Sequence, residues 1–142
     1  MTAQIKDILN YDSKKYFLAS EPLQPFLAQH NNITFYGYST ACIRGYLAIW
    51  EIRDKKLFLV GLHAKIIKEN KKIKVGVDYL FAGKSEIFAS WFNGVVRIPT
   101  GKLLKYIHLG YQSIFEKDLF LNFKDGILLS ETIKENQLDS KY

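Results

Sequence analysis

From residue 33 onward, turn-forming residues divide the chain into short runs of β-branched and aromatic side chains. The run Gly45 to Arg53 is an example, with Trp50 near its centre. Both of its faces are largely apolar, which is typical of a strand inside a sheet. Short strands with closely spaced turn signals predict an antiparallel sheet that curls or closes. We therefore predict a mainly β (β-rich α+β) fold, a curled antiparallel sheet or partly closed barrel of about seven strands with short N-terminal helices.

Length and composition fit one folded domain. The chain has 142 residues, of which 48% are hydrophobic and 15% aromatic. That composition excludes intrinsic disorder, and the length is within the usual size of a single domain. We expect a helical N-terminal segment over 1–32, a β-rich body over 33–134 and a polar tail over 135–142.

Helical spacing is confined to the N-terminal segment. Ile5, Ile8 and Leu9 follow the i, i+3, i+4 pattern of one helix face. A second short helix is expected through Leu23, Phe26 and Leu27, after Pro22.

Several turns can be placed from dipeptides with unusual backbone preferences. Asn93-Gly94 predicts a hairpin with a type I′ turn, or alternatively the C-terminal end of a helix. Pro99 to Lys102 reads as a turn, and Asp125-Gly126 closes a terminal hairpin. In that hairpin we expect Ile127 and Leu129 to face inward.

The formal net charge of +6 comes from the first half of the chain. Residues 1–76 contain 12 Lys and Arg against 6 Asp and Glu, whereas the remainder is balanced. Such a patch attracts phosphates, acidic lipids or an acidic protein face, although lysines at a solvated hairpin tip also prevent unwanted strand pairing. Arg, the usual reader of nucleic acid, occurs only three times, so nucleic-acid binding would be weak and salt-sensitive. The basic patch consists of Lys65, Lys68, Lys71, Lys72 and Lys74, opposed only by Glu69.

The chain lacks the motifs of common enzyme classes. Ala82 to Ser85 imitates the end of a phosphate-binding loop, but Asp78 occupies the position of its first glycine. His30, His63 and His108 are widely spaced, and the only cysteine is Cys42. We therefore expect no metal, no cofactor and no catalytic residue identifiable from sequence, although a site assembled only in three dimensions stays open.

Some polar and aromatic residues are still candidates for a ligand site. His108, Tyr111 and Glu116 would suit acid–base chemistry at a rim, or would satisfy backbone groups at a barrel mouth. Arginines beside apolar strands need carboxylates, and Glu51 and Glu116 are the expected partners, with an anion site as the alternative. The tryptophans are core anchors or the wall of a ligand cavity. The candidate ligand-binding set is Arg44, Trp50, Trp91, Arg97, His108, Tyr111 and Glu116.

Two blocks resemble a group of small bacterial proteins without an established activity. The first is RGYLAIWEI from Arg44 to Ile52, and the second contains WFNG from Trp91, PTGK from Pro99 and GY at Gly110. The resemblance implies a bacterial origin but no catalytic residues. The N-terminus has no apolar signal region and the longest apolar stretch is too short to span a bilayer, so we expect a cytoplasmic protein without a membrane span.

Three functions remain open from the sequence. The first is a non-enzymatic module that binds one protein partner, as small immunity proteins do. The second is a small-ligand-binding barrel or an enzyme, with its site near Trp50, Trp91, His108 and Glu116. The third is a weak nucleic-acid or phosphate binder that uses Lys65 to Lys74.

Overall fold

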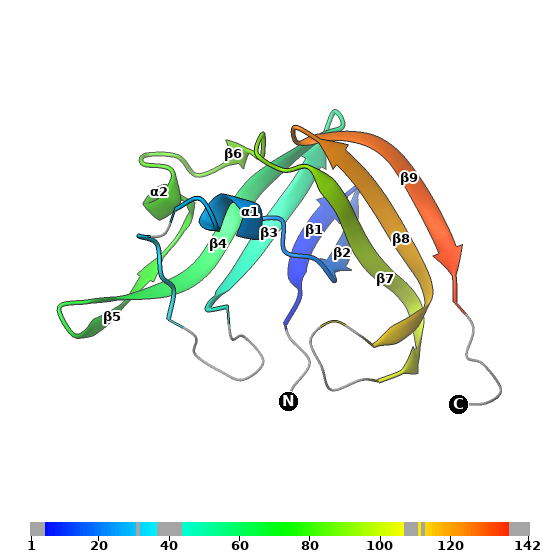
Figure 1. The fold of residues 1–142 in the computed structure, drawn as a ribbon, viewed down its shortest axis with the longest axis horizontal. Coiled ribbons are helices and arrows are strands. Elements are labelled where there is room, and N and C mark those ends of the chain that lie inside the picture. Colours follow the sequence, from blue (N-terminus) through cyan, green and yellow to red (C-terminus); the bar gives the residue numbers. More distant parts are fainter. Residues whose placement is uncertain (1–4, 31, 37–43, 107–110, 112, 137–142) are drawn as a thin grey trace.

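A computed structural model describes residues 5–30, 32–36, 44–106, 111 and 113–136 (Figure 1). Strands account for most of this part of the chain, and both helices are four residues long. The elements are β1 (Asp7–Tyr11), β2 (Lys14–Leu18), α1 (Gln24–Leu27), β3 (Tyr46–Arg53), β4 (Lys56–Lys68), β5 (Lys71–Val75), α2 (Val77–Leu80), β6 (Ile87–Phe88), β7 (Gly94–Lys105), β8 (Ile114–Lys124) and β9 (Ile127–Glu135).

The strands form one curled, mixed sheet that does not close. Its order is β2-β1-β3-β4-β9-β8-β7, and β5 and β6 each pair with β4. All strand pairs are antiparallel except β1 with β3, which run parallel. The predicted β-rich, curled architecture is confirmed, and β3 lies inside the sheet as expected.

The ends of the sheet approach each other. Beyond the end of β2, the N–H of Ala19 donates to the carbonyl of Arg97 on β7 over 2.8 Å. Elsewhere the sheet is loosely joined, because Lys56 and Ile127 are the one residue pair in register between β4 and β9 among the described residues. The strand β9 then diverges from β4, which leaves the sheet curled and open (Figure 1).

The prediction of a helix through Ile5, Ile8 and Leu9 is wrong. Ile8 and Leu9 lie on β1 of the β1–β2 hairpin, and Ile5 precedes the strand. The turn residues Asp12 and Ser13 have φ of 52° and 62°. Two consecutive positive φ values are the geometry of a type I′ turn, which suits the twist of paired strands. The second predicted helix is confirmed as α1.

The turn predicted at Asn93-Gly94 is also wrong. Gly94 starts the long strand β7, and the Asn93 side chain instead accepts a hydrogen bond from the Asp125 N–H. The predicted turn at Pro99 to Lys102 also lies inside β7. There Gly101, with φ of 81°, interrupts the register with β8 without reversing the chain.

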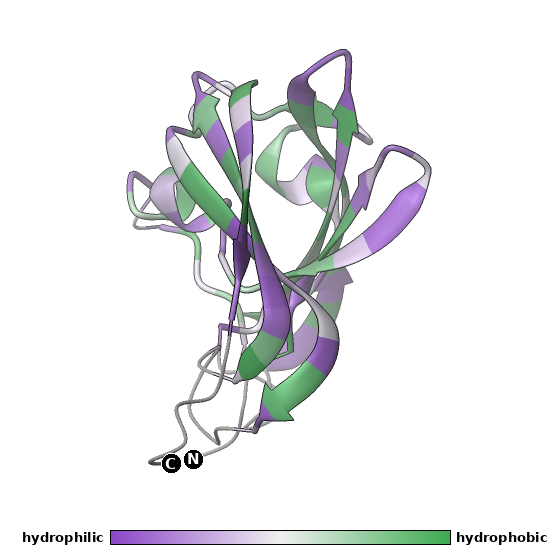
Figure 2. Cartoon of the chain, turned by 90° about the vertical axis from the view of Figure 1, so that its right-hand side faces the viewer, coloured by the Kyte–Doolittle hydropathy of each residue, from purple (hydrophilic) through white to green (hydrophobic). Residues whose placement is uncertain are grey.

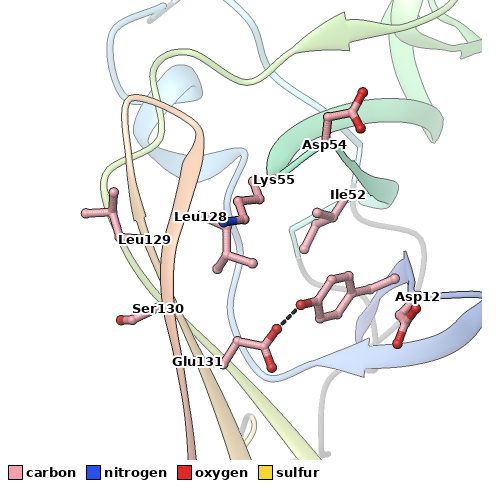
Figure 3. Close-up of a pocket in the computed structure, with 9 residues that line it drawn as sticks. Asp12, Ile52, Asp54, Lys55, Leu128, Leu129, Ser130 and Glu131 are labelled. Atoms are coloured by element: carbon pink, nitrogen blue, oxygen red, sulfur yellow. Dashed lines mark hydrogen bonds between the residues drawn. The ribbon is translucent and has the colours of Figure 1, made fainter.

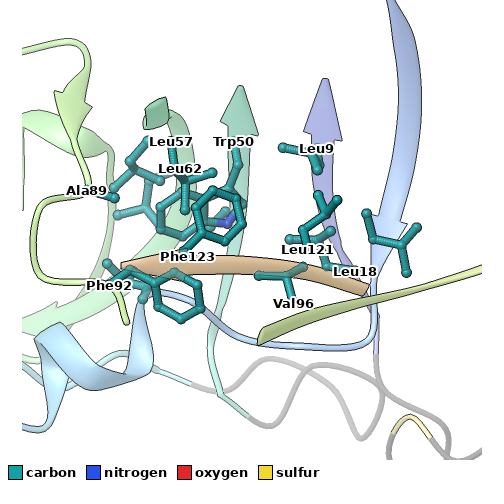
Figure 4. Close-up of a cluster of buried hydrophobic side chains, with 14 of the residues drawn as sticks. Leu9, Leu18, Trp50, Leu57, Leu62, Ala89, Phe92, Val96, Leu121 and Phe123 are labelled. Carbon is teal, nitrogen blue, oxygen red and sulfur yellow. The ribbon is translucent and has the colours of Figure 1, made fainter. Parts of the chain in front are cut away.

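The core fills the inside of the curl. Buried and more exposed residues alternate along β3, β4 and β7, and hydrophobic and hydrophilic segments alternate along the ribbons in Figure 2. Trp50 is fully buried at the centre, with leucines of β1, β2 and β4 around it (Figure 4). On β3 the predicted face of Tyr46, Ala48 and Trp50 is the buried one.

Candidate functional site

An ion pair between Asp7 and Arg44 lies inside the curled sheet. Asp7 begins β1 on its inward face, and its side chain is fully buried. The Arg44 side chain, just before β3, is 6% exposed and donates to Asp7 Oδ1 over 2.7 Å. Asp7 also accepts from the Ala48 N–H and from the Trp50 indole, each at 3.1 Å. Both carboxylate oxygens therefore accept hydrogen bonds, from donors on β3 and from Arg44.

The Arg44 guanidinium links three further segments to this pair. It donates to the Ile5 carbonyl over 2.6 Å and to the Tyr111 hydroxyl over 2.7 Å. Its Nε is buried without a hydrogen-bond partner, and the Glu21 carboxylate lies 3.9 Å from it. The guanidinium also lies over the Tyr46 ring, with its carbon 4.9 Å from the ring centroid.

Burial and pairing act in opposite directions on the two charges. Burial raises the pKa of the Asp7 carboxyl, although Arg44 and the indole and backbone donors lower it in part. For Arg44, burial disfavours the charge, yet the nearby Asp7 carboxylate holds the pKa of the guanidinium above its ordinary value. Both oxygens of Asp7 already accept hydrogen bonds. Asp7 therefore links β1 to β3 and to Arg44, and it is poorly placed for proton transfer to a substrate.

The expected arginine pairs form, but with other carboxylates. Arg97 pairs with Asp118 over 3.0 Å, on the outer side of β7 and β8, and donates to the carbonyls of Tyr111 and Ser113. Glu116 instead accepts from the Lys102 N–H. The expectation that Glu116 pairs with either arginine is therefore wrong.

Glu51 is likewise not a partner of Arg44. It pairs with Arg53 at the exposed end of β3, over 3.0 Å.

The sequence pattern did not identify Asp7 as a site residue, because the spacing of its apolar neighbours indicates a helix, in which Asp7 would lie on the polar side. The alternation of Asp7, Leu9 and Tyr11 is the signal that a strand reading would have used.

The remaining candidate residues lie in different surroundings. Trp91 contacts Trp50 edge-on, with 6.3 Å between the ring centroids, and its indole donates to the Pro22 carbonyl. Arg44, Trp50 and Tyr111 thus belong to one network, and Trp91 joins it through the Trp50 ring. His108 and Cys42 lie outside the described residues.

The predicted basic patch forms the β4–β5 hairpin, which projects from the body of the sheet (Figure 1). Residues Glu69 and Asn70 form its turn with φ of 53° and 63°, as in a type I′ turn. Lys65 faces Lys74 across the hairpin, and Lys68 faces Lys71. Opposite residues share a face of the sheet, and like charges in this arrangement repel.

Apolar side chains are interleaved with these lysines. Ile67, which is 52% exposed, lies opposite Lys72. Ile73, which is 38% exposed, lies opposite Ile66. The Lys72 ammonium lies over the Tyr36 ring. Among the described residues, no carboxylate forms an ion pair with Lys68, Lys71, Lys72 or Lys74. The hairpin therefore presents both uncompensated positive charge and exposed apolar surface.

Three cavities lie away from this hairpin. The first, about 560 Å³, opens where β9 diverges from the turns of β1–β2 and β3–β4, and Tyr11 donates to Glu131 across it (Figure 3). A second, about 480 Å³, is lined by α2 and by Gly83 to Ser85. A third, about 460 Å³, lies on the outer face of β1 and β2. None of these three is lined by a described member of the candidate ligand-binding set.

Two further properties bear on function. Within the described ranges, no three His, Cys, Asp or Glu side chains are grouped closely enough to hold a metal ion. In the same ranges, neither helix has the length and apolar character needed to cross a membrane. Comparison of the chain with known protein families, curated proteins and solved structures found no match.

Proposed function

We propose that the protein is a non-enzymatic binding module whose β4–β5 hairpin docks on an acidic face of one protein partner. The observation that carries the proposal is the positive charge of Lys68, Lys71 and Lys74 on this projecting hairpin. Two lysine pairs face each other across it, and Lys68, Lys71, Lys72 and Lys74 have no carboxylate partner among the described residues. An acidic partner would relieve this repulsion, and complementary charge would speed and orient the encounter.

The mixture of side chains favours a protein over a nucleic acid. Ile67 and Ile73 are exposed between the lysines, and apolar contacts of this kind suit the centre of a protein interface. The hairpin contains no arginine, the side chain that best matches phosphate with two parallel hydrogen bonds.

The interior of the protein supports a binding role in a second way. The Asp7 carboxylate and the Arg44 guanidinium are enclosed and bonded to the protein itself. Trp50 is completely buried against this pair. A ligand or substrate at these residues would have to displace existing hydrogen bonds, whereas the hairpin is accessible without rearrangement.

The proposal predicts that reversing three hairpin charges abolishes partner binding. The variant is Lys68→Glu, Lys71→Glu and Lys74→Glu, and the partner is captured from a native lysate on the wild-type protein, identified and purified. We expect its affinity for the variant to fall at least about 100-fold, because like charges juxtaposed across an interface cost several kcal/mol. Isothermal titration calorimetry measures both dissociation constants.

A matched control carries the same change in net charge elsewhere. Lys14, Lys55 and Lys124 lie at or beside the turns of the β1–β2, β3–β4 and β8–β9 hairpins and are exposed. Their combined replacement by Glu should leave the affinity within about threefold of wild type, as expected for charges remote from an interface. Equal loss in both variants would contradict the proposal. So would salt-sensitive binding of duplex DNA or RNA in filter assays without any protein partner, since phosphate neutralisation makes affinity fall steeply with salt.

A further inference from the structure

An apolar groove lies on the outer face of the sheet, where hydrophilic side chains are usual. It has a volume of about 460 Å³ and spans the seam at which the end of β2 meets β7. This volume falls within the range of small-molecule sites, roughly 300–1,000 Å³. Its apolar lining is Ile5, Ile8, Phe17, Leu47, Pro99 and Phe115.

Positive charge lies at the edges of this groove. Lys6 is the only ionisable residue among its described lining, and its ammonium lies 5.1 Å from the centroid of the Phe115 ring. On the β2 side, the Lys15 ammonium lies 5.7 Å from the Phe17 ring centroid. Each lysine is thus held beside an aromatic wall of the groove, an arrangement that attracts a cation to the ring face.

The charge of Lys6 has no counter-ion among the residues that the structure describes. Partial burial lowers the pKa of Lys6, and repulsion from the nearby Arg97 lowers it further. Arg97 itself is already paired with Asp118. An anion next to Lys6 would therefore compensate a charge that the fold leaves partly desolvated.

We infer that this groove binds a free medium-chain carboxylate, with its alkyl chain on Ile8, Phe17 and Leu47 and its carboxylate at Lys6. The alkyl chain covers apolar side chains that are otherwise exposed to water, among them Phe17, which is 50% exposed. The carboxylate supplies the missing counter-ion. This site is separate from the β4–β5 hairpin, so it stands independently of the proposed partner interface.

The test uses decanoate, decanol and decyltrimethylammonium as probes of the full-length protein by isothermal titration calorimetry. Decanoate should bind at least about tenfold more tightly than either other probe, because a hydrogen bond to a charged group contributes about 1.5–3 kcal/mol. Lys6→Met keeps a long side chain but removes the charge. It should weaken decanoate about tenfold and leave decanol unchanged.

A second variant tests the apolar wall. Phe17→Ser, at an exposed position, should weaken decanoate and decanol together, whereas Lys55→Met at the β3–β4 turn should change neither. Amide chemical shifts report whether the variants remain folded and whether decanoate perturbs Ile8 and Leu47. Equal binding of the three probes, or decanoate binding unaffected by Lys6→Met, would overturn the inference. Binding to anionic vesicles without binding of free decanoate would overturn it as well.

Discussion

Arg44→Met is expected to destabilise the protein by about 3–5 kcal/mol at neutral pH, because it leaves a buried carboxylate without its counter-ion. The Asp7 side chain is fully buried and has Arg44 as its paired cation. The substitution also removes the donors that hold the Ile5 carbonyl and the Tyr111 hydroxyl. Urea denaturation measures the change in the free energy of unfolding, under conditions in which the wild-type transition is two-state.

The cost of Arg44→Met should depend on pH in a defined direction. Burial raises the pKa of Asp7 in the folded protein, and Arg44 opposes that rise, so removing Arg44 raises this pKa further. A carboxyl whose folded pKa exceeds its unfolded value, about 3.9, stabilises the fold most below the unfolded value. That stability is lost as pH rises through the folded pKa. The variant should therefore be closest to wild type in acid and furthest from it at neutral pH.

The exposed Arg53 provides the control. It pairs with Glu51 and Glu86 at the surface, and surface ion pairs contribute little. Arg53→Met should therefore stay near wild type at every pH. A cost of Arg44→Met that is small, or that does not change between acid and neutral pH, would show that the Asp7 charge is solvated in the folded protein.

The buried pair also shows where sequence reasoning succeeds and fails. Alternation along β3 predicts its buried face because each strand contributes its period independently of its partners. The partner of Arg44 is a different kind of question. Asp7 is 37 residues away, and the two meet only because β1 lies parallel to β3. A parallel pair is not joined by a tight turn, so no local signal announces it.

The glycine-containing dipeptides predict a hairpin turn correctly only where both residues adopt positive φ. Asp125-Gly126 does so and closes the predicted β8–β9 hairpin. The two-residue turn sets Lys124 opposite Ile127 and Phe123 opposite Leu128, so Leu128 shares the inward face of Phe123 and is buried. The expectation that Ile127 and Leu129 face inward is wrong for this reason, since both are exposed. A difference of one residue in register exchanges the two faces of a strand, and the spacing of Ile127 and Leu129 alone does not show which face is inward.

The basic patch and the apolar groove also differ in whether the sequence predicts them. The basic patch was predictable because its lysines are neighbours in sequence and a hairpin keeps them together. The apolar groove was not, because its walls come from β1, β2, β3, β7 and β8 and converge only through the curl of the sheet. Each wall residue taken alone reads as an ordinary exposed apolar side chain.

Gly126→Ala should be the most damaging of the glycine substitutions in the turns. Gly126 has φ of 77°, and a Cβ there would lie 2.4 Å from the Ala89 backbone oxygen. Its N–H donates to the Phe92 carbonyl and its carbonyl accepts from Leu57, so the turn cannot move away without breaking the junction of β4 with β9. The left-handed backbone costs about 1–2 kcal/mol and the overpacking about 1–3 kcal/mol more.

Gly83→Ala separates these two contributions. Gly83 has a nearly identical φ of 76°, but a Cβ there meets nothing within 4 Å. Its substitution should therefore cost only the backbone part, about 1–2 kcal/mol, in the same urea experiment. If the two variants are equally stable, Ala89 yields to the new methyl group, and the junction that holds β9 to the rest of the sheet is looser than its hydrogen bonds imply. A larger loss for Gly126→Ala shows that this junction is rigid, and that the opening beyond it is set by the divergence of β9 and not by a mobile turn.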